Sequence, residues 1–280
     1  MSEKISIYIP AYNAENTIEQ TIDSILQQTI NVDEIIVVND NSTDRTEEII
    51  KKFSKIKILN NKKNMGLGFN RNLAIKECKN KIVGGIDADV VLDKFWLEKL
   101  LKYLNHNHIF MCGGNMIEKL TQNKYNSWRA KYYSQNWGNK DLNNPPFLYG
   151  CNTLQFKNIW EKVGGYDETL ITNGEDIDYT KKVKSFENHN LFYSSEALCY
   201  HLQNDDMKSL SRRIWRYHSY GYKIKKPTFY RFLKLCIKQL NFFLSRLLEN
   251  LIKLNFFFIY ISFNVLIDFI KLEFNNCLKK

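Results

Sequence analysis

The chain has 280 residues, 44% hydrophobic and 25% charged, so it can bury a large globular core and is not a disordered segment. Its net charge of +10 is uneven, with ten Lys/Arg against three Asp/Glu in residues 225–280 and thirty against twenty-seven before them. The nearly neutral body argues against a protein that binds nucleic acid. Six scattered cysteines form no Cys-x-x-Cys or Cys/His cluster, which disfavours a zinc knuckle or a disulfide framework and favours a reducing compartment.

Short apolar runs alternate with amphipathic segments in the first half of the chain. Met1 leads straight into a strand pattern without an apolar signal region, so we expect a cytoplasmic enzyme body. Strands are predicted at residues 5–9, 34–38 and 56–59 and in the apolar run that leads to Asp87, with helices between them. This alternation predicts an α/β fold with a doubly wound, mostly parallel sheet that has helices on both faces. Ligands bind outside the carboxyl ends of such strands.

The second half is less regular. Residues 115–148 are predicted to be irregular, and their aromatic side chains suit contact with a sugar acceptor and plain packing equally well. We then expect a helix from Gly174 to about Phe186, strands at 191–193 and 197–201, and a basic helix at 208–222. The Lys225-Lys226-Pro227 segment is the one plausible domain boundary.

Two acidic pairs and one histidine are candidates for chemistry. Asp87 and Asp89 follow a buried strand one residue apart, so their carboxylates can share a face and hold Mg²⁺ or Mn²⁺, although a solvated turn explains them too. Glu175 and Asp176 open a helix, where the macrodipole favours carboxylates without any function, but a cleft-edge carboxylate can also be a general base. His201 is either an ordinary partly buried histidine or a ligand that completes a metal site.

Six segments, in this order, resemble the family 2 glycosyltransferases. They are Ile-Pro-Ala-Tyr-Asn at 9–13, Ile-Ile-Val-Val-Asn-Asp-Asn-Ser-Thr-Asp at 35–44, Asn-Met-Gly-Leu-Gly at 64–68 with Arg71, Asp-Ala-Asp at 87–89, Val-Gly-Gly-Tyr-Asp at 163–167 and Gly-Glu-Asp-Ile-Asp at 174–178. The resemblance implies a GT-A fold over residues 1–224, with a nucleotide-sugar-binding half at 1–112 and an acceptor-binding half at 113–224. It implies an inverting enzyme that moves one hexosyl or N-acetylhexosaminyl group, with a UDP-sugar as the favoured donor, to a hydroxyl of a glycan or lipid-linked acceptor. Such an enzyme would act in polysaccharide or glycolipid biosynthesis.

The resemblance also implies site residues. Asp176 would be the general base, and Asp89 with His201 and Asp87 would hold Mn²⁺ or Mg²⁺ against the donor diphosphate. Asn39-Asp40-Asn41 departs from the commoner Asp-Asp-Gly, so Asn39 has no assigned role. No Gln-x-x-Arg-Trp motif follows Asp176, which favours transfer of a single sugar. The residues implied in binding the nucleotide-sugar are Pro10, Tyr12, Asp40, Arg71, Asp87 and Glu175.

Residues 225–280 are predicted to form basic amphipathic helices. Polar residues recur every three or four positions from 231 to 253, and the remainder is rich in Phe, Leu and Ile. Asp268 would be costly at the centre of a bilayer. We therefore expect helices lying on the inner face of the membrane as a peripheral attachment, with a homodimer-forming hairpin second and a transmembrane segment third.

Two other functions remain open. A nucleotidyltransferase could also use a paired-Asp metal site, although residues 10–13 lack the Gly-rich, basic phosphate loop that such enzymes need. A non-enzymatic scaffold on the membrane surface is the third possibility, which the intact acidic positions disfavour.

Overall fold

The computed structural model describes residues 3–104, 106, 108–186, 190–219 and 228–278. The chain divides into two compact units, which we describe separately. Unit 1 comprises residues 1–119 and 134–202, and unit 2 comprises residues 120–133 and 203–280. The boundary expected at Lys225-Lys226-Pro227 lies outside the described residues, and it remains a prediction, as do the donor and acceptor halves.

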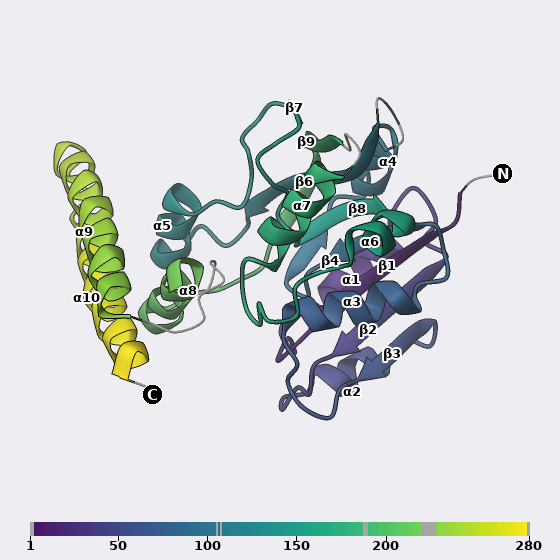
Figure 1. The fold of residues 1–280 in the computed structure, drawn as a ribbon, viewed down its shortest axis with the longest axis horizontal. Coiled ribbons are helices and arrows are strands. Elements are labelled where there is room, and N and C mark those ends of the chain that lie inside the picture. The colour runs from purple at the N-terminus through teal and green to yellow at the C-terminus, as the bar shows by residue number, and fades with distance from the viewer. Residues whose placement is uncertain (1–2, 105, 107, 187–189, 220–227, 279–280) are drawn as a thin grey trace. The chain divides into compact units, whose positions relative to one another are not determined.

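Unit 1 is built on one sheet of nine strands in the order β3-β2-β1-β4-β8-β6-β9-β5, with β7 paired to β9 (Figure 1). Strands β1 to β4 are parallel to one another, and β8 runs antiparallel to β4 and to β6. The strands are β1 (Ile5–Ala11), β2 (Glu34–Asn39), β3 (Ile56–Asn60), β4 (Ile82–Ile86), β5 (Val90–Leu92), β6 (Ile109–Glu118), β7 (Leu142–Asn143), β8 (Asn152–Phe156) and β9 (Asn190–His201).

Helices cover both faces of this sheet because consecutive side chains of a buried strand point to opposite faces. Ile7 and Ile9 pack on one face with side chains of α1 (Ile18–Leu26), α2 (Thr46–Ile50) and α4 (Trp96–Leu101). Tyr8 packs on the other face with α3 (Leu67–Glu77), α6 (Lys157–Val163) and α7 (Glu175–Ser185). The predicted doubly wound, mostly parallel architecture is confirmed.

The segment 115–148 is more regular than predicted. β6 continues to Glu118, and α5 (Lys124–Tyr132) follows, so the prediction of an irregular segment was wrong there. The Asn123 side chain caps α5 by accepting a hydrogen bond from the Tyr125 amide at 2.8 Å. Only three residues of α5 are buried, and two of them, Asn126 and Arg129, are polar, so the helix carries no apolar stripe that the sequence could reveal.

Unit 2 is helical and basic. Trp128 of α5 packs with Leu210 and Ile214 of α8 (Met207–Ser219) and with residues of α10 (Phe256–Leu278), which explains why α8 groups with the C-terminal helices. Residues of this unit include 18 Lys/Arg and 5 Asp/Glu, a formal charge of +13, whereas unit 1 carries 22 against 25, or −3. The excess positive charge of the chain therefore belongs wholly to unit 2.

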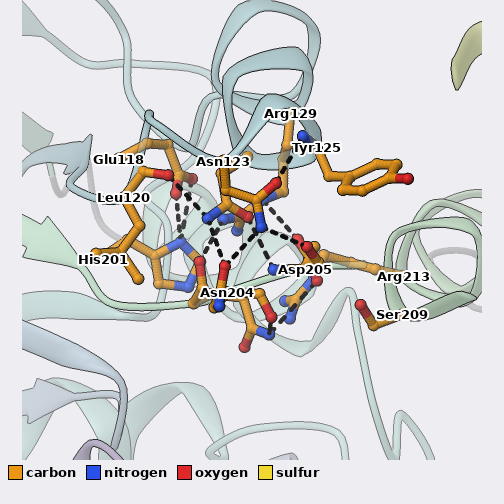
Figure 2. Close-up of polar contacts among 12 residues, drawn as sticks. Glu118, Leu120, Asn123, Tyr125, Arg129, His201, Asn204, Asp205, Ser209 and Arg213 are labelled. Atoms are coloured by element: carbon orange, nitrogen blue, oxygen red, sulfur yellow. Dashed lines mark hydrogen bonds and ion pairs between the residues drawn. The ribbon is translucent and has the colours of Figure 1, made fainter. Parts of the chain in front are cut away.

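Asp205 and Arg246 are two buried charged groups of unit 2, one paired with arginines and the other enclosed by aromatic rings. Asp205 is fully buried, 2.9 Å from Arg129 Nε and 3.6 Å from Arg213 Nε (Figure 2). The Arg246 guanidinium lies 4.7–5.4 Å from the ring centroids of four aromatic side chains. Burial, reinforced by the positive charges of Lys238 and Arg246, lowers the pKa of His218 to about 4.

Helices α9 (Phe229–Ile252) and α10 form an antiparallel hairpin, since Phe243 contacts Phe263 and Phe232 contacts Phe274. Six Leu and Ile side chains on α9, spaced three or four residues apart, are 44–65% exposed: Leu233, Ile237, Leu240, Leu244, Leu248 and Leu251. We call them the α9 apolar face. Among the described residues, no helix combines the length and the hydropathy needed to cross a lipid bilayer.

Candidate active site

The predicted donor-binding residues lie at the carboxyl ends of neighbouring strands in unit 1. Pro10 is buried within β1, and Tyr12, just beyond it, is 52% exposed. Asp40 follows β2, and Asp87 follows β4. Because β2, β1 and β4 are parallel neighbours, these residues meet at one edge of the sheet.

Asp40 is buried and organises the loop before α3. Its Oδ1 accepts hydrogen bonds from the Met65 amide and the Asn61 side chain, both at 2.8 Å, and its Oδ2 accepts one from the Gly66 amide at 3.0 Å. Gly66 has φ +86°, and a Cβ there would lie 2.6 Å from Ile171 Cγ2. Glycine is therefore required by both conformation and space. The loop in turn determines where α3 begins.

Arg71 of α3 connects the end of β4 with the start of α7. Its side chain is 1% exposed, and Nη2 donates to Asp87 Oδ1 at 2.8 Å while Nη1 donates to the Gly150 carbonyl at 2.7 Å. Its Nε lies 3.4 Å from Glu175 Oε1. A buried guanidinium thus binds two carboxylates that lie 88 positions apart in the sequence.

Asp176 binds the other side of the same glycine. The Gly150 amide donates to Asp176 Oδ2 at 3.0 Å, whereas its carbonyl accepts from Arg71. A Cβ at Gly150 would lie 3.0–3.1 Å from atoms of both side chains, so the packing leaves little space for one. The predicted general base is therefore held beside the Arg71–Asp87 pair.

The closely spaced carboxylates affect one another. Burial and the neighbouring Asp176 charge raise the pKa of Glu175 to about 8, against the opposing effect of Arg71. Burial also raises the pKa of Asp87, an effect that Arg71 opposes and that Asp89 and Asp176 reinforce. Asp87 keeps 28% of its side-chain surface exposed, so this acidic group can be reached from solvent.

A second cluster forms around His201, the last residue of β9. Its Nε2 lies 3.2 Å from Asp89 Oδ2. Its Nδ1 lies 3.0 Å from both oxygens of Glu118, the last residue of β6 (Figure 2). Burial disfavours a charged ring, but the two carboxylates outweigh it and raise the pKa of His201 to about 9. Sequence reasoning identified Asp89 and His201 but missed Glu118, which ends an otherwise mostly apolar strand with no motif around it.

The Asp89–His201 pair fits a divalent cation as two ligands of a larger set. Ligand atoms at adjacent octahedral positions, each about 2.1 Å from Mg²⁺, lie about 3.0 Å apart, close to the observed 3.2 Å. The described part of the chain contains no group of three His, Cys, Asp or Glu side chains arranged to hold a metal ion. Oδ1 of Asp87, predicted as a further ligand, is instead hydrogen-bonded to Arg71. Water and phosphate oxygens would have to complete the coordination.

Residues 6–164 match the sequence profile of the family described as Glycosyl transferase family 2. A protein of Haemophilus influenzae named "Uncharacterized glycosyltransferase" is 35% identical over 187 residues, which cover 64% of this chain and 58% of the relative. The "Uncharacterized glycosyltransferase RP339" of Rickettsia prowazekii is 31% identical over 205 residues, 70% of this chain and 63% of the relative. The matched part thus spans about three fifths of these relatives.

Solved structures show the same fold at low sequence identity. The mannosyltransferase PcManGT from Pyrobaculum calidifontis, in complex with GDP-Man and Mn²⁺, has a TM-score of 0.64 at 15% identity over 98% of this chain and 88% of that one. Residues 1–349 of S. aureus TarS, in complex with UDP-GlcNAc, have a TM-score of 0.61 at 20% identity over 85% of this chain and 67% of that one. Since the family profile spans more than half of the sequence and the sheet has the matching architecture, this chain belongs to family 2 of the glycosyltransferases and has the GT-A fold.

Proposed function

We propose that the protein is an inverting glycosyltransferase that moves one sugar from a nucleoside diphosphate to an acceptor hydroxyl. The observation that carries this proposal is the arrangement around Gly150, where Asp176 binds the amide while Arg71 binds the carbonyl and Asp87. A carboxylate beside the carboxyl ends of the strands, where ligands of such sheets bind, supports this proposal. Family membership and the six ordered motifs support the same function.

The reaction follows from these positions. The acceptor oxygen bonds to the anomeric carbon as the bond from that carbon to the diphosphate oxygen breaks, and Asp176 takes the hydroxyl proton. One displacement inverts the configuration, and its transition state has oxocarbenium character, as in glycoside hydrolysis. General base catalysis of this kind contributes about 10²–10⁴-fold.

The donor proposed is a UDP-sugar that carries a hexosyl or N-acetylhexosaminyl group. Pro10, Tyr12 and Asp40 would surround the base, Arg71 and Glu175 would form the buried side of the site, and Asp87 would contact the ribose. Proteins with the same fold have been solved with UDP-GlcNAc and with GDP-Man, so the fold accommodates either nucleotide. A donor panel is therefore needed to identify the sugar and the base.

Asp89 and His201 would hold Mn²⁺ or Mg²⁺, and coordination by Asp87 remains a prediction. A bound divalent ion offsets the negative charge that develops on a leaving diphosphate. Related folds solved with Mn²⁺ support this choice of ion. The donor set, one carboxylate and one imidazole, is compatible with Mn²⁺, and Mg²⁺ would depend more on oxygen ligands from the substrate.

The test is a panel of nucleotide-sugars incubated with the full chain and Mn²⁺. Release of nucleoside diphosphate from a nucleotide-sugar supports the proposal. A nucleotidyltransferase would instead release pyrophosphate when it is given a nucleoside triphosphate and a sugar phosphate. Asp176→Asn should bind the donor normally and lose about 10²–10⁴-fold in rate. The matched control is Asp178→Asn on the same helix, because Asp178 pairs with Lys182 one turn further on and should stay within about 3-fold of wild type. Equal rates for Asp176→Asn and wild type would remove Asp176 from its role.

We further propose that unit 2 attaches the enzyme to the cytoplasmic face of the membrane, where a glycan or lipid-linked acceptor is available. Two features of that unit support lipid as the occupant of the α9 apolar face. The face is too apolar for a free surface, and its unit carries a formal charge of +13, which anionic headgroups would offset. A second copy of the same unit would bring like charges together, so a homodimer is the less favoured occupant.

Sedimentation with phosphatidylglycerol vesicles tests this attachment. Ile237→Glu with Leu244→Glu should abolish the binding, since both side chains belong to the α9 apolar face. The control Gln20→Glu with Gln27→Glu adds the same two charges at exposed positions of unit 1 and should change it little. Unchanged vesicle binding by the Ile237→Glu, Leu244→Glu variant would refute the lipid assignment. If light scattering shows that the wild type is a dimer and that this variant is a monomer, the α9 apolar face binds a second copy of the chain instead.

A further inference from the structure

The backbone places Asp89, His201 and Glu118 together at the ends of three adjacent strands. β9 lies between β6 and β5 in the sheet, with Glu118 opposite His201 in the parallel β6–β9 pair. The His201 carbonyl accepts a hydrogen bond from the Lys119 amide at 3.2 Å, and the Leu202 amide donates to the Asp89 carbonyl at 2.8 Å. Strand pairing on both sides of β9 therefore fixes the relative positions of the three side chains.

A neutral imidazole has one N–H donor and one lone pair, and its neighbours decide which nitrogen carries the proton. Glu118 is 8% exposed, and both its oxygens lie 3.0 Å from Nδ1 of His201. An ionised carboxylate only accepts hydrogen bonds, so it holds the proton on Nδ1. The lone pair of Nε2 then points toward Asp89 Oδ2, 3.2 Å away, and either a second ring proton on Nε2 or a bound cation can join these two atoms.

We infer that Glu118 is a positioning residue that fixes the Nδ1–H tautomer of His201 and so directs Nε2, with Asp89, toward a divalent cation. This inference rests on the metal site proposed above and deepens it. A carboxylate that accepts from the far nitrogen of a ligating histidine orients the ring and raises its basicity, and loss of such a partner typically costs 10–100-fold in metal affinity.

The alternative is that Glu118 only fills space at the end of β6. A purely structural carboxylate would leave both the tautomer of His201 and the metal affinity unchanged once the protein folds. Glu118→Gln separates the two explanations, because an amide of nearly the same size can donate its NH₂ to Nδ1 and so favour the Nε2–H tautomer, which has no lone pair for a metal.

The first measurement needs no substitution at Glu118. Nitrogen-15 NMR of the histidine rings at about pH 10, with the His201 signal assigned by its loss in His201→Asn, reports which nitrogen is protonated. We expect the Nδ1–H tautomer in the metal-free wild type. The Nε2–H tautomer would overturn the inference.

The second measurement is Mn²⁺ binding, followed by electron paramagnetic resonance with Mn²⁺ alone and with Mn²⁺ plus inorganic pyrophosphate. Glu118→Gln should bind Mn²⁺ about 10–100-fold more weakly than wild type. The control is Glu34→Gln, which alters a carboxylate at the amino end of β2 that accepts from Ser6 and the Lys79 amide, and it should keep wild-type affinity. If Glu118→Gln binds Mn²⁺ as tightly as the wild-type protein does, the inference about Glu118 is overturned but the metal site is not. If the wild-type protein itself binds no Mn²⁺, the proposed metal site is overturned as well.

Discussion

Replacing Arg71 with methionine should strongly destabilise unit 1. The substitution removes a cation that is 1% exposed and leaves Asp87 and Glu175 without it, while the Gly150 carbonyl loses a donor. Breaking a buried ion pair by removing one partner costs about 3–5 kcal/mol, because the remaining charge is left uncompensated. For a unit of this size, each 1 kcal/mol lowers the Tm by about 2–4 °C, so we expect a loss of about 6–20 °C.

The matched control is Arg45→Met. Arg45 also pairs with a carboxylate, Glu15, at 3.2 Å, but its side chain is 73% exposed, and such surface pairs contribute about 0–1 kcal/mol. Urea unfolding of both variants and the wild type, followed by circular dichroism, gives the free energies. If Arg71→Met loses no more than Arg45→Met, the guanidinium does not compensate the buried carboxylates and the argument fails.

The effect of Arg71→Met should also depend on pH. Folding raises the pKa of Glu175 from its ordinary value of 4.5 to about 8, so the folded state retains a proton that the unfolded state releases. Stability from this group is complete below about pH 4.5 and is lost as the pH rises through 8. Without Arg71 the pKa of the carboxyl should rise further, so the deficit should be larger at about pH 8.5 than at about pH 5.5. A deficit that is equal at both pH values would contradict this account.

Three other perturbations follow from the same structure. Asp89→Ala should abolish metal-dependent binding of UDP, measured by calorimetry with and without Mn²⁺, and undiminished binding would contradict the metal assignment. Gly66→Ala should cost about 1–3 kcal/mol in thermal unfolding, because φ is +86° and the new Cβ would clash with Ile171; a stability equal to wild type would mean that the loop shifts freely. In unit 2, folding lowers the pKa of His218 from 6.5 to about 4, so the stability of this unit should fall as the pH decreases from 6.5 toward 4. Hydrogen exchange of the α9 amides measures this stability, and His218→Gln should make it depend less on pH.

The order of the strands and helices of unit 1 up to β4 could be predicted because it depends on local patterns. β2 and β4 are short apolar runs bounded by polar residues, which is the pattern expected of a strand in a sheet whose two faces are both covered. The placement of Asp40 and Asp87 after these strands followed from the same pattern. The family resemblance then assigned roles to them, and the assignments to individual residues remain predictions.

Partners from distant parts of the chain could not be predicted. Arg71 was expected beside the nucleotide, but its contacts with Asp87, Glu175 and the Gly150 carbonyl depend on how α3, β4 and α7 pack. Likewise, no local pattern marks α5 as a helix, because its buried face is formed partly by Arg129 and Asn126.

The sequence by itself thus determined the sheet, its covered faces and the acidic residues at one edge, since periodicity and strand ends are properties of neighbouring residues. Only the tertiary structure decided that Glu118 meets His201 and that α8 joins the C-terminal helices in a unit of charge +13. The physical reason is that hydrogen bonding and desolvation act between groups that folding brings together, whatever their separation along the chain.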